Sequence, residues 1–256
     1  MKLATLIRPF ATRRATRLAG AALVALSLGA CALPPSDPVG REAYWEANDP
    51  FEGVNRAVFG LNEGTDILVI RPAAEIYRGV VPSPVRDAVR NFLRNLASPI
   101  VIANQLLQGD MKGVSVAVRR FLINTTVGVG GLVDVAEREG LPYESEDFGQ
   151  TLAVWGVPEG PYVVLPLLGP SSVRDSVGLA ADTAADPVRI VANHNEADDV
   201  LIGRAAASGV DTRARLIEPV DDLRKNSLDY YAAVRSLYRQ RREADITDRK
   251  AAAIPQ

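Results

Sequence analysis

The stretch Asp49-Pro50-Phe51-Glu52 introduces the local pattern that dominates the rest of this chain. Asp is a good helix-capping residue, Pro is favoured at the first helical position, and an acidic residue two positions later completes a helix start. The apolar residues from this point recur at spacings of three and four: Phe51, Val54, Val58 and Phe59. This spacing predicts a helix with one apolar face over residues 50–63.

The same kind of start signal, a capping residue followed by Pro, returns at Ser83-Pro84, Ser98-Pro99 and Asp186-Pro187. Stop signals stand at Gly109 and at Arg71-Pro72. Together with apolar periodicity they predict helices over 50–63, 65–79, 84–96, 99–107, 111–125, 172–184, 187–207, 210–218 and 220–242. Strand-like patterning is scarce, and Tyr162–Leu165 is the best candidate. The predicted fold class is therefore mostly α.

The first 30 residues have the pattern of a secretory signal peptide that ends at Cys31. Five basic residues precede an uncharged run over 18–30, and the run closes with Leu28-Gly29-Ala30 directly before the cysteine. This context resembles a bacterial lipobox, in which the thiol is diacylated and the new N-terminus is acylated after cleavage. The alternative, an unmodified lone thiol, is unusual in an oxidising compartment. We expect a lipoprotein signal peptide over 1–30 and lipidation of Cys31.

Composition restricts the function of the remaining chain. Removal of the leader leaves 24 basic and 31 acidic side chains, a net charge of −7, which argues against nucleic acid as a partner. A single His and no cysteine beyond Cys31 exclude His/Cys metal sites and thiol catalysis, so neither a metal nor a cofactor is expected. The chain is 47% apolar but has no apolar run long enough to span a membrane. Part of its body is expected to rest in one leaflet.

Two apolar segments do not follow the helical pattern. The first, over 124–134, is interrupted by Gly128, Gly130 and Gly131, which leave backbone N–H groups open. The second, over 155–170, contains several prolines and glycines and cannot form a regular helix. Because an apolar loop is costly to leave in water, we expect it to be buried in protein or in lipid.

Many ordered motifs resemble those of the VacJ/MlaA family of outer-membrane lipoproteins. They include Asn48-Asp-Pro-Phe-Glu-Gly-Val-Asn-Arg56, Asn104-Gln-Leu-Leu-Gln-Gly-Asp110, Arg120-Phe-Leu-Ile-Asn-Thr125, Phe148-Gly-Gln-Thr-Leu152, Gly160-Pro-Tyr-Val-Val-Leu-Pro166 and Asp229-Tyr-Tyr-Ala-Ala-Val-Arg235. The resemblance covers about residues 48–243. It divides the chain into a lipidated tether over 31–48, a helical domain over 49–243 and a disordered tail over 244–256.

The resemblance implies a ring-like arrangement of short amphipathic helices around a pore, lying in the inner leaflet of the outer membrane and facing the periplasm. It further implies that phospholipids misplaced in the outer leaflet pass through the pore to a soluble periplasmic carrier, which maintains lipid asymmetry. Members of the family associate with trimeric porins. The expected activity is transport and not catalysis.

Pore-lining or gating candidates come from the two glycine-containing apolar segments and one nearby cation. They are Asn124, Gly128, Gly130, Gly131, Gly156, Gly160, Tyr162, Leu165 and Arg174. Each has a structural alternative. The glycines at 128–131 could form only tight turns, Ser172–Asp175 reads as a capping box around Arg174, and the 155–170 loop could be a static plug. In the gating interpretation, Gly156 and Gly160 are hinges on either side of Pro158.

Two other functions remain open at this point. Gly113-Val-Ser115-Val-Ala117 is similar to a degenerate nucleophile elbow, and Asp182 or Asp186 precedes the sole histidine, His194, in the order of an envelope lipid hydrolase. However, an elbow needs a preceding strand, and the residues before Ser115 have the pattern of a turn that enters a helix. A porin-bound structural scaffold without a lipid path is the other alternative.

Overall fold

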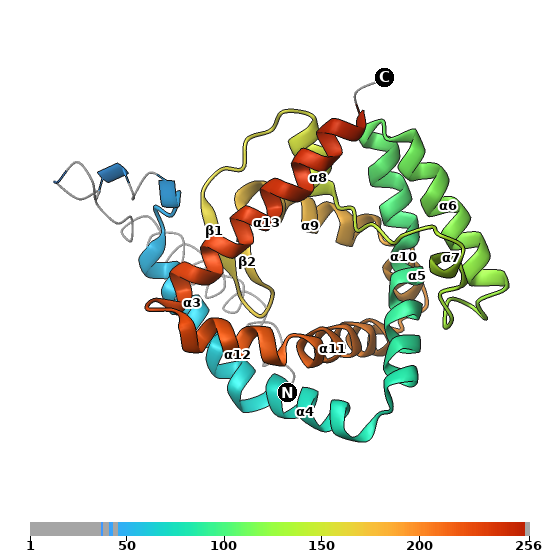
Figure 1. Ribbon diagram of the computed structural model, residues 1–256, viewed down its shortest axis with the longest axis horizontal. Helices are drawn as coiled ribbons and strands as arrows, with labels where there is room; N and C mark the ends of the chain where they lie inside the picture. The colour runs from blue at the N-terminus through green and yellow to red at the C-terminus, as the bar shows by residue number, and fades with distance from the viewer. Residues whose placement is uncertain (1–36, 38–40, 43–45, 254–256) are drawn as a thin grey trace, which may run out of the picture.

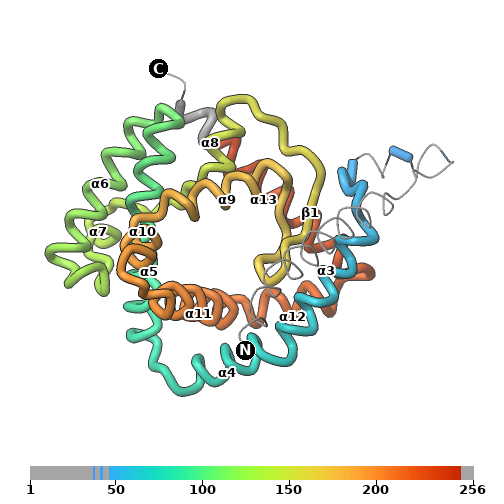
Figure 2. Tube along the Cα trace, turned by 180° about the vertical axis from the view of Figure 1, so that it is seen from behind, coloured from blue at the N-terminus to red at the C-terminus, as the bar shows by residue number. Residues whose placement is uncertain are grey.

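The computed structural model describes residues 37, 41–42 and 46–253. Its helices follow one another around a flat ring, which is seen face-on in Figure 1 and from behind in Figure 2. Most helix axes run around the ring in its own plane, so the thickness of the ring does not follow from helix length. The signal peptide over 1–30, Cys31 and most of the 31–48 tether lie outside the described residues.

The ring begins with a continuous helical segment made of α3 (Glu52–Thr65), the π-helical turn η1 (Asp66–Ile70) and α4 (Arg71–Val80). The expected break at Arg71-Pro72 is absent. The Arg71 N–H donates to the Asp66 carbonyl oxygen five residues earlier, which is the wider bonding pattern of a π turn. Pro72 therefore sits in the first turn of α4, where a missing N–H is tolerated.

Helix α5 (Ser83–Gln108) forms one side of the ring and joins the two helices predicted over 84–96 and 99–107. The predicted boundary at Ser98-Pro99 is wrong, because Pro99 lies inside the helix. Residues on both sides of it, including Asn95 and Val101, are buried, and α5 packs along α6 (Met111–Thr126). This packing outweighs the lost hydrogen bond. The helix ends at Gly109 as predicted, with φ +79°.

Two short helices, α7 (Val135–Arg138) and α8 (Phe148–Val154), were not predicted. Each begins after an aspartate whose side chain caps the first turn. Asp134 accepts from the Glu137 N–H at 3.0 Å, and Asp147 accepts from the Gln150 N–H at 2.9 Å. The capping signal is therefore present in the sequence, but the apolar period after it is too short to be detected.

Helix α9 (Val173–Ala185) is confirmed, and Ser172 caps it by accepting from the Asp175 N–H at 3.1 Å. The prediction of one helix over 187–207 is wrong, since the chain forms α10 (Pro187–His194) and α11 (Asp198–Arg215). Glu196 between them has φ +55°, which no helical residue adopts. Helix α11 then continues through Gly209, where a boundary was expected.

The last predicted helix, over 220–242, is also divided. Helix α12 (Ile217–Asn226) ends where Ser227 becomes extended, and α13 (Tyr230–Ala253) begins after Asp229, which accepts from the Ala232 N–H at 3.1 Å. The structure differs from the expected tail over 244–256, because α13 extends to Ala253. Figure 1 shows α13 across one side of the ring, over the strands and α9.

A β-hairpin interrupts the helices. Strand β1 (Tyr162–Leu165), as predicted, pairs antiparallel with β2 (Gly169–Ser172), which was not predicted. Tyr162 stands opposite Ser172, and Val164 stands opposite Pro170. Pro170 obscured the second strand, but a proline is tolerated at the edge of a sheet. The hairpin lies between α3 and α13, and it forms the side of the ring opposite α5.

Candidate functional site: the ring and its two glycine-containing segments

Many large apolar side chains of the ring are exposed, and they come from elements at several places around it. Leu68 in η1 is 77% exposed, Val80 at the end of α4 is 75% exposed, and Val127 after α6 is 68% exposed. Leu167 and Leu168 at the hairpin turn are exposed to a similar degree. Soluble monomers rarely leave so much aliphatic surface in water. This surface is therefore suited to a hydrocarbon environment.

The buried side chains have the opposite character. Apolar burial is confined to small groups, such as Ala74, Ala214 and Ile217 between α4, α11 and α12. Polar and charged residues are more numerous among the buried side chains of the described segments, and many come from α5, α8 and α9. Their hydrogen bonds must hold the ring together, because apolar packing inside it is limited. No helix in the described part of the chain is long and apolar enough to cross a membrane.

The segment over 124–134 is a tight turn fixed by side chains from its two ends. The Asn124 side chain donates to Asp134 Oδ1 at 2.9 Å and accepts from the Ala136 N–H at 3.0 Å. Arg120, which is buried, donates to Asp134 Oδ2 at 2.7 Å. Burial alone would raise the pKa of Asp134, but the bonds from Asn124 and Arg120 hold that pKa below its usual value.

The glycines of this turn have distinct roles. A Cβ on Gly128 would lie 2.3 Å from the Val133 carbonyl oxygen and 2.5 Å from the Asn124 carbonyl oxygen, so no side chain fits there. Gly131 has φ +93°, and a Cβ on it would collide with Asn95 of α5. Gly130 also has positive φ but faces open space. The turn interpretation accounts for these three glycines. Whether they also line a lipid path stays a prediction.

The β-hairpin is attached by three asparagines spaced seven residues apart, of which Asn55 and Asn62 lie in α3 and Asn48 precedes it. Asn48 donates to the Gly160 carbonyl oxygen at 2.6 Å. Asn55 donates to the Tyr162 carbonyl oxygen at 3.0 Å and accepts from the Val164 N–H at 2.9 Å. These side chains occupy the edge of β1 that β2 leaves free.

The third member, Asn62, holds the hairpin turn. It donates to the Leu165 carbonyl oxygen at 2.9 Å and accepts from the Leu167 N–H at 2.7 Å. From Asn55 to Asn62 the helix advances by about 10 Å, which is the length of about three residues of strand. We call Asn48, Asn55 and Asn62 the asparagine ladder. Its spacing was visible in the sequence, but no sequence rule pairs a helix with a strand edge in this way.

The candidates of the second segment separate into hinge-like and fixed positions. Gly156 has φ +90° with open space beyond it, and Gly160 has φ +69° against Val173. Tyr162 is fully buried, whereas Leu165 is only partly buried. Proline requires φ near −65°, so substitution of either glycine by proline would distort the loop and would not simply stiffen it. Proline variants at these positions would therefore not separate loss of hinge motion from loss of folding.

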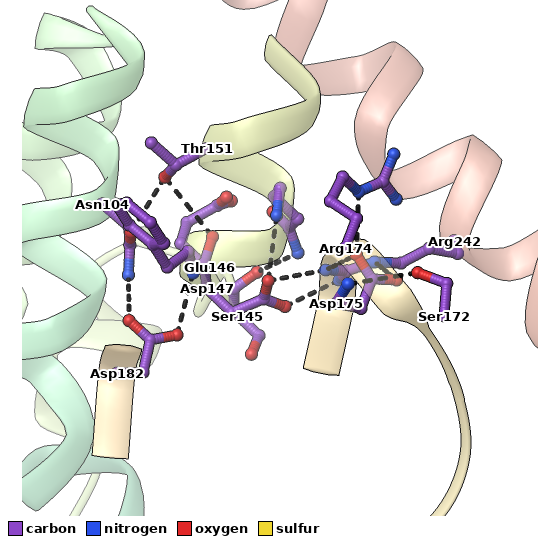
Figure 3. Close-up of polar contacts among 12 residues, drawn as sticks. Asn104, Ser145, Glu146, Asp147, Thr151, Ser172, Arg174, Asp175, Asp182 and Arg242 are labelled. Atoms are coloured by element: carbon purple, nitrogen blue, oxygen red, sulfur yellow. Dashed lines mark hydrogen bonds and ion pairs between the residues drawn. The ribbon is translucent and has the colours of Figure 1, made fainter. Parts of the chain in front are cut away.

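Arg174 is buried at the start of α9, where its Nε donates to Asp175 at 3.0 Å. Asp175 is also held by Arg242 of α13, which makes paired bonds to Asp175 and to Asp147 of α8 (Figure 3). Burial alone would raise the pKa of Asp175, but Arg242 and Tyr238 hold it below the usual value. The cluster ties three helices together, and Arg174 belongs to it.

A second buried group lies beside it in Figure 3. Asp182 of α9 accepts from the Asn104 side chain of α5 at 2.9 Å and from the Phe148 N–H of α8 at 2.8 Å. Thr151 donates to Asn104 at 2.8 Å. Burial raises the pKa of Asp182, since none of these partners carries a positive charge. The motifs around Asn104 and Phe148 thus meet in space.

Among the described residues, no hydrogen bond or ion pair joins Ser115, His194 and the aspartates of the hydrolase arrangement. Ser115 lies in the second turn of α6 and follows a capped helix start, not a strand. Asp182 bonds to Asn104 and Phe148, and Asp186 bonds to Val188 and Arg204. Among the described residues, no group of three or more His, Cys, Asp or Glu is placed to hold a metal ion.

The comparisons agree with the fold. The family profile described as "MlaA lipoprotein" matches residues 47–245. The Escherichia coli (strain K12) protein described as "Intermembrane phospholipid transport system lipoprotein MlaA" is 36% identical over 231 residues, which are 89% of this chain and 87% of that protein. A Rickettsia felis protein described as uncharacterized is 39% identical over 78% of this chain and 79% of its own length.

A solved structure described as "Structural basis for maintenance of bacterial outer membrane lipid asymmetry" superposes with a TM-score of 0.67. It is 37% identical, and the match covers 77% of this chain and 98% of that one. The motifs, the helical ring and these matches agree over the same residues. This chain belongs to the MlaA lipoprotein family.

Proposed function

We propose that this protein is an outer-membrane lipoprotein that removes mislocalised phospholipids from the outer leaflet and passes them to a soluble periplasmic carrier. The names of its relatives, which concern intermembrane phospholipid transport and lipid asymmetry, support this function. In this proposal the ring lies in the inner leaflet, faces the periplasm and associates with a trimeric porin. The protein acts without catalysis.

The observation that carries the proposal is the distribution of side chains in the ring, in which apolar residues are exposed and polar residues are buried. Aliphatic side chains such as Leu68 and Val80 are exposed, while hydrogen-bonded polar groups such as Asp175 and Arg242 join the helices between them. A body with an apolar circumference is stable within a leaflet, and polar groups inside it can accompany a charged headgroup. In a scaffold surrounded by water, this exposed apolar surface would be unfavourable.

The energetics of lipid extraction favour a continuous path. A phospholipid taken from a bilayer exposes about 30 methylenes at about 0.8 kcal/mol each, roughly 25 kcal/mol in total. Thermal motion does not supply this energy in one step, so an apolar wall or a carrier must always contact the chains. The phosphate faces the opposite penalty in hydrocarbon and needs polar partners.

In this proposal the path runs beside the two glycine-containing segments. The 124–134 turn, with Asn124, Gly128, Gly130 and Gly131, is the fixed wall because its side chains and backbone are tightly packed. The 155–170 segment is the movable gate. Gly156 and Gly160 are its hinges, Tyr162 and Leu165 are its body, and Arg174 faces the headgroup.

Partition of the protein without its lipid anchor tests the location of the ring. A chain that starts at Asn48 lacks Cys31 and its acyl groups, so only the ring can bind lipid. We expect this chain to bind liposomes of neutral phospholipid despite its negative charge, because the exposed leucines and valines provide the affinity. A soluble monomer without membrane affinity would contradict the embedded ring.

Release of the hairpin turn tests the gate. Asn62→Ala removes both bonds to Leu165 and Leu167 and leaves the rest of the asparagine ladder in place. If the ladder holds the gate closed, the variant should leak phospholipid and raise its level in the outer leaflet, measured in cells at matched protein level. Asn193→Ala, at an exposed asparagine of α10, is the matched control.

If the Asn62→Ala cells keep the lipid asymmetry of the wild type, the second candidate function is favoured, a porin-bound scaffold without a lipid path.

Lipidation is tested separately. Mass spectrometry of the purified N-terminus should show triacylated Cys31 and no residues from 1–30. Cys31→Ser should leave an uncleaved precursor. An intact thiol would show that the anchor is absent.

A further inference from the structure

The first half of α5 carries arginines at three positions four residues apart: Arg86, Arg90 and Arg94. Residues at this spacing lie along one stripe of a helix. Neighbouring like charges in such a row repel and slightly destabilise the helix. A row of three cations therefore suggests a role other than helix stability.

A cleft of about 720 Å³ lies between this part of α5 and the segment over 132–143. Arg90 and Arg94 line it from α5, and Arg138 and Tyr143 line it from the opposite wall. Its volume is within the range of small-molecule sites in proteins. The cleft adjoins the 124–134 turn at Leu132 and Val133.

The acidic residues of the cleft are already paired. Asp87 forms an ion pair with Arg90 within α5. Asp134 and Glu137 form ion pairs with Arg120, at 2.7 and 3.2 Å. Asp87 is matched by one arginine, whereas Asp134 and Glu137 share the single charge of Arg120, so this wall keeps part of one negative charge. The three cations of α5 together with Arg138 exceed this remainder.

Two arginines of the cleft have no carboxylate partner among the described residues. Arg138 is exposed at the end of α7. The Arg94 guanidinium lies 4.5 Å from the centre of the Tyr143 ring, a contact that uses its face and leaves its N–H groups available. Burial lowers the pKa of Arg94, and the charges of Arg90 and Arg215 add to this effect, while Tyr143 and Asp134 oppose it only in part. An anion nearby would therefore stabilise its charged form.

Apolar side chains line the cleft together with these cations. Leu132 and Val133 are exposed on the wall opposite α5, and Pro84 and Ala88 line the α5 side. A free anion would gain nothing from this apolar surface. An amphipathic ligand would place its phosphate between the arginines and its chains against the apolar residues.

We propose that this cleft binds the phosphodiester group of an anionic phospholipid through Arg94 and Arg138, with Arg90 as a third, partly compensated cation. Guanidinium groups bind phosphate oxygens through paired hydrogen bonds, which gives geometric selectivity. The choice of a lipid, and not free phosphate, rests on the proposed transport function and on the apolar surroundings.

The test is a binding titration of the purified full-length protein in detergent with dihexanoylphosphatidylglycerol. Dihexanoylglycerol, which lacks the phosphate, and inorganic phosphate, which lacks the chains, separate the two contributions. We expect the phospholipid to bind more tightly than either. Arg94→Gln should weaken its binding about tenfold, and Arg94→Gln with Arg138→Gln should weaken it further.

The matched control is Arg189→Gln with Arg241→Gln, which removes the same charge from two exposed arginines that form no ion pair in the described chain. Phospholipid binding by this control should equal that of the wild type. If the Arg94/Arg138 double variant binds the phospholipid as tightly as the wild type, the proposed site is wrong. If inorganic phosphate binds as tightly as the phospholipid, the assignment to a lipid is wrong. The titration contains no membrane and no carrier protein, so its result does not depend on transport. A failed transport assay would contradict the proposed function and would leave the binding result unchanged.

Discussion

The two glycine-containing segments have similar compositions and different mechanical properties. In the 124–134 turn, Gly128 is enclosed by backbone atoms and Gly131 lies against α5, so glycine is required by contact. In the 155–170 segment, Gly156 and Gly169 have positive φ and nothing near the missing side chain. At these two positions glycine is required only by backbone conformation.

The difference extends to the groups that hold each segment in place. The turn is fixed by a charged cluster in which Arg120 and Asn124 bond to Asp134. The hairpin is held by the uncharged asparagine ladder and by packing of Tyr162 against Tyr231 and Tyr238 of α13. A similar content of glycine thus forms a rigid wall in one place and a removable contact in the other, which is the basis for their different roles in the proposed path.

Alanine substitution at glycine should give the largest difference between the two segments. Gly128→Ala forces a Cβ into two carbonyl oxygens, and we expect it to lower the free energy of unfolding by about 3 kcal/mol or more, or to prevent folding. Gly156→Ala meets open space and should cost about 1 kcal/mol, for the positive φ alone. Thermal unfolding in detergent, followed by circular dichroism, measures both.

Gly130→Ala is the control within the turn, because Gly130 has positive φ but no close neighbour. It should resemble Gly156→Ala and not Gly128→Ala. Equal effects at Gly128 and Gly130 would mean that the turn relaxes around an added methyl group, and the wall would then be no more rigid than the hairpin.

The asparagine ladder should show a smaller gradient along the hairpin. Asn55→Ala leaves the buried Val164 N–H without its partner and removes a bond to Asp49, so we expect a loss of about 2–3 kcal/mol. Asn62→Ala acts at the more exposed turn and should cost about 1 kcal/mol. The same unfolding measurement applies. A larger loss at Asn62 than at Asn55 would contradict the view that the turn is the releasable end.

Local signals in the sequence predicted the helical character of the chain and much of its punctuation. Gly109 ends α5, Ser172 caps α9, and β1 occupies the expected residues. These features depend on a few neighbouring residues, and sequence rules describe them well. The boundary predicted at Pro99 was wrong because burial on both sides of the proline outweighs its local preference.

The candidate site was less accessible from the sequence. Arg174 was identified, but its partner Arg242 lies 68 residues later, and only the fold brings both to Asp175. The asparagine ladder and the cleft at Arg94 likewise combine segments that are distant in sequence. The regular spacing of the asparagines and of the arginines is visible in the sequence. The strand edge and the 132–143 segment that they face are not.

The smallest expected difference between the segments is their response to acid. The pKa of Asp134 is held below its usual value, so its contribution to stability is complete above about pH 4 and is lost as the pH falls through the lowered value. The asparagine bonds to the hairpin do not titrate. Hydrogen exchange between pH 5 and pH 3, corrected for intrinsic rates, should therefore show loss of protection at residues 124–136 before residues 160–167. Asp134→Asn cannot lose a charge in this range, so its turn should show weaker protection at pH 5 and little further change. Loss of protection in the hairpin first, or an unchanged acid response in Asp134→Asn, would show that the charged cluster does not fix the turn.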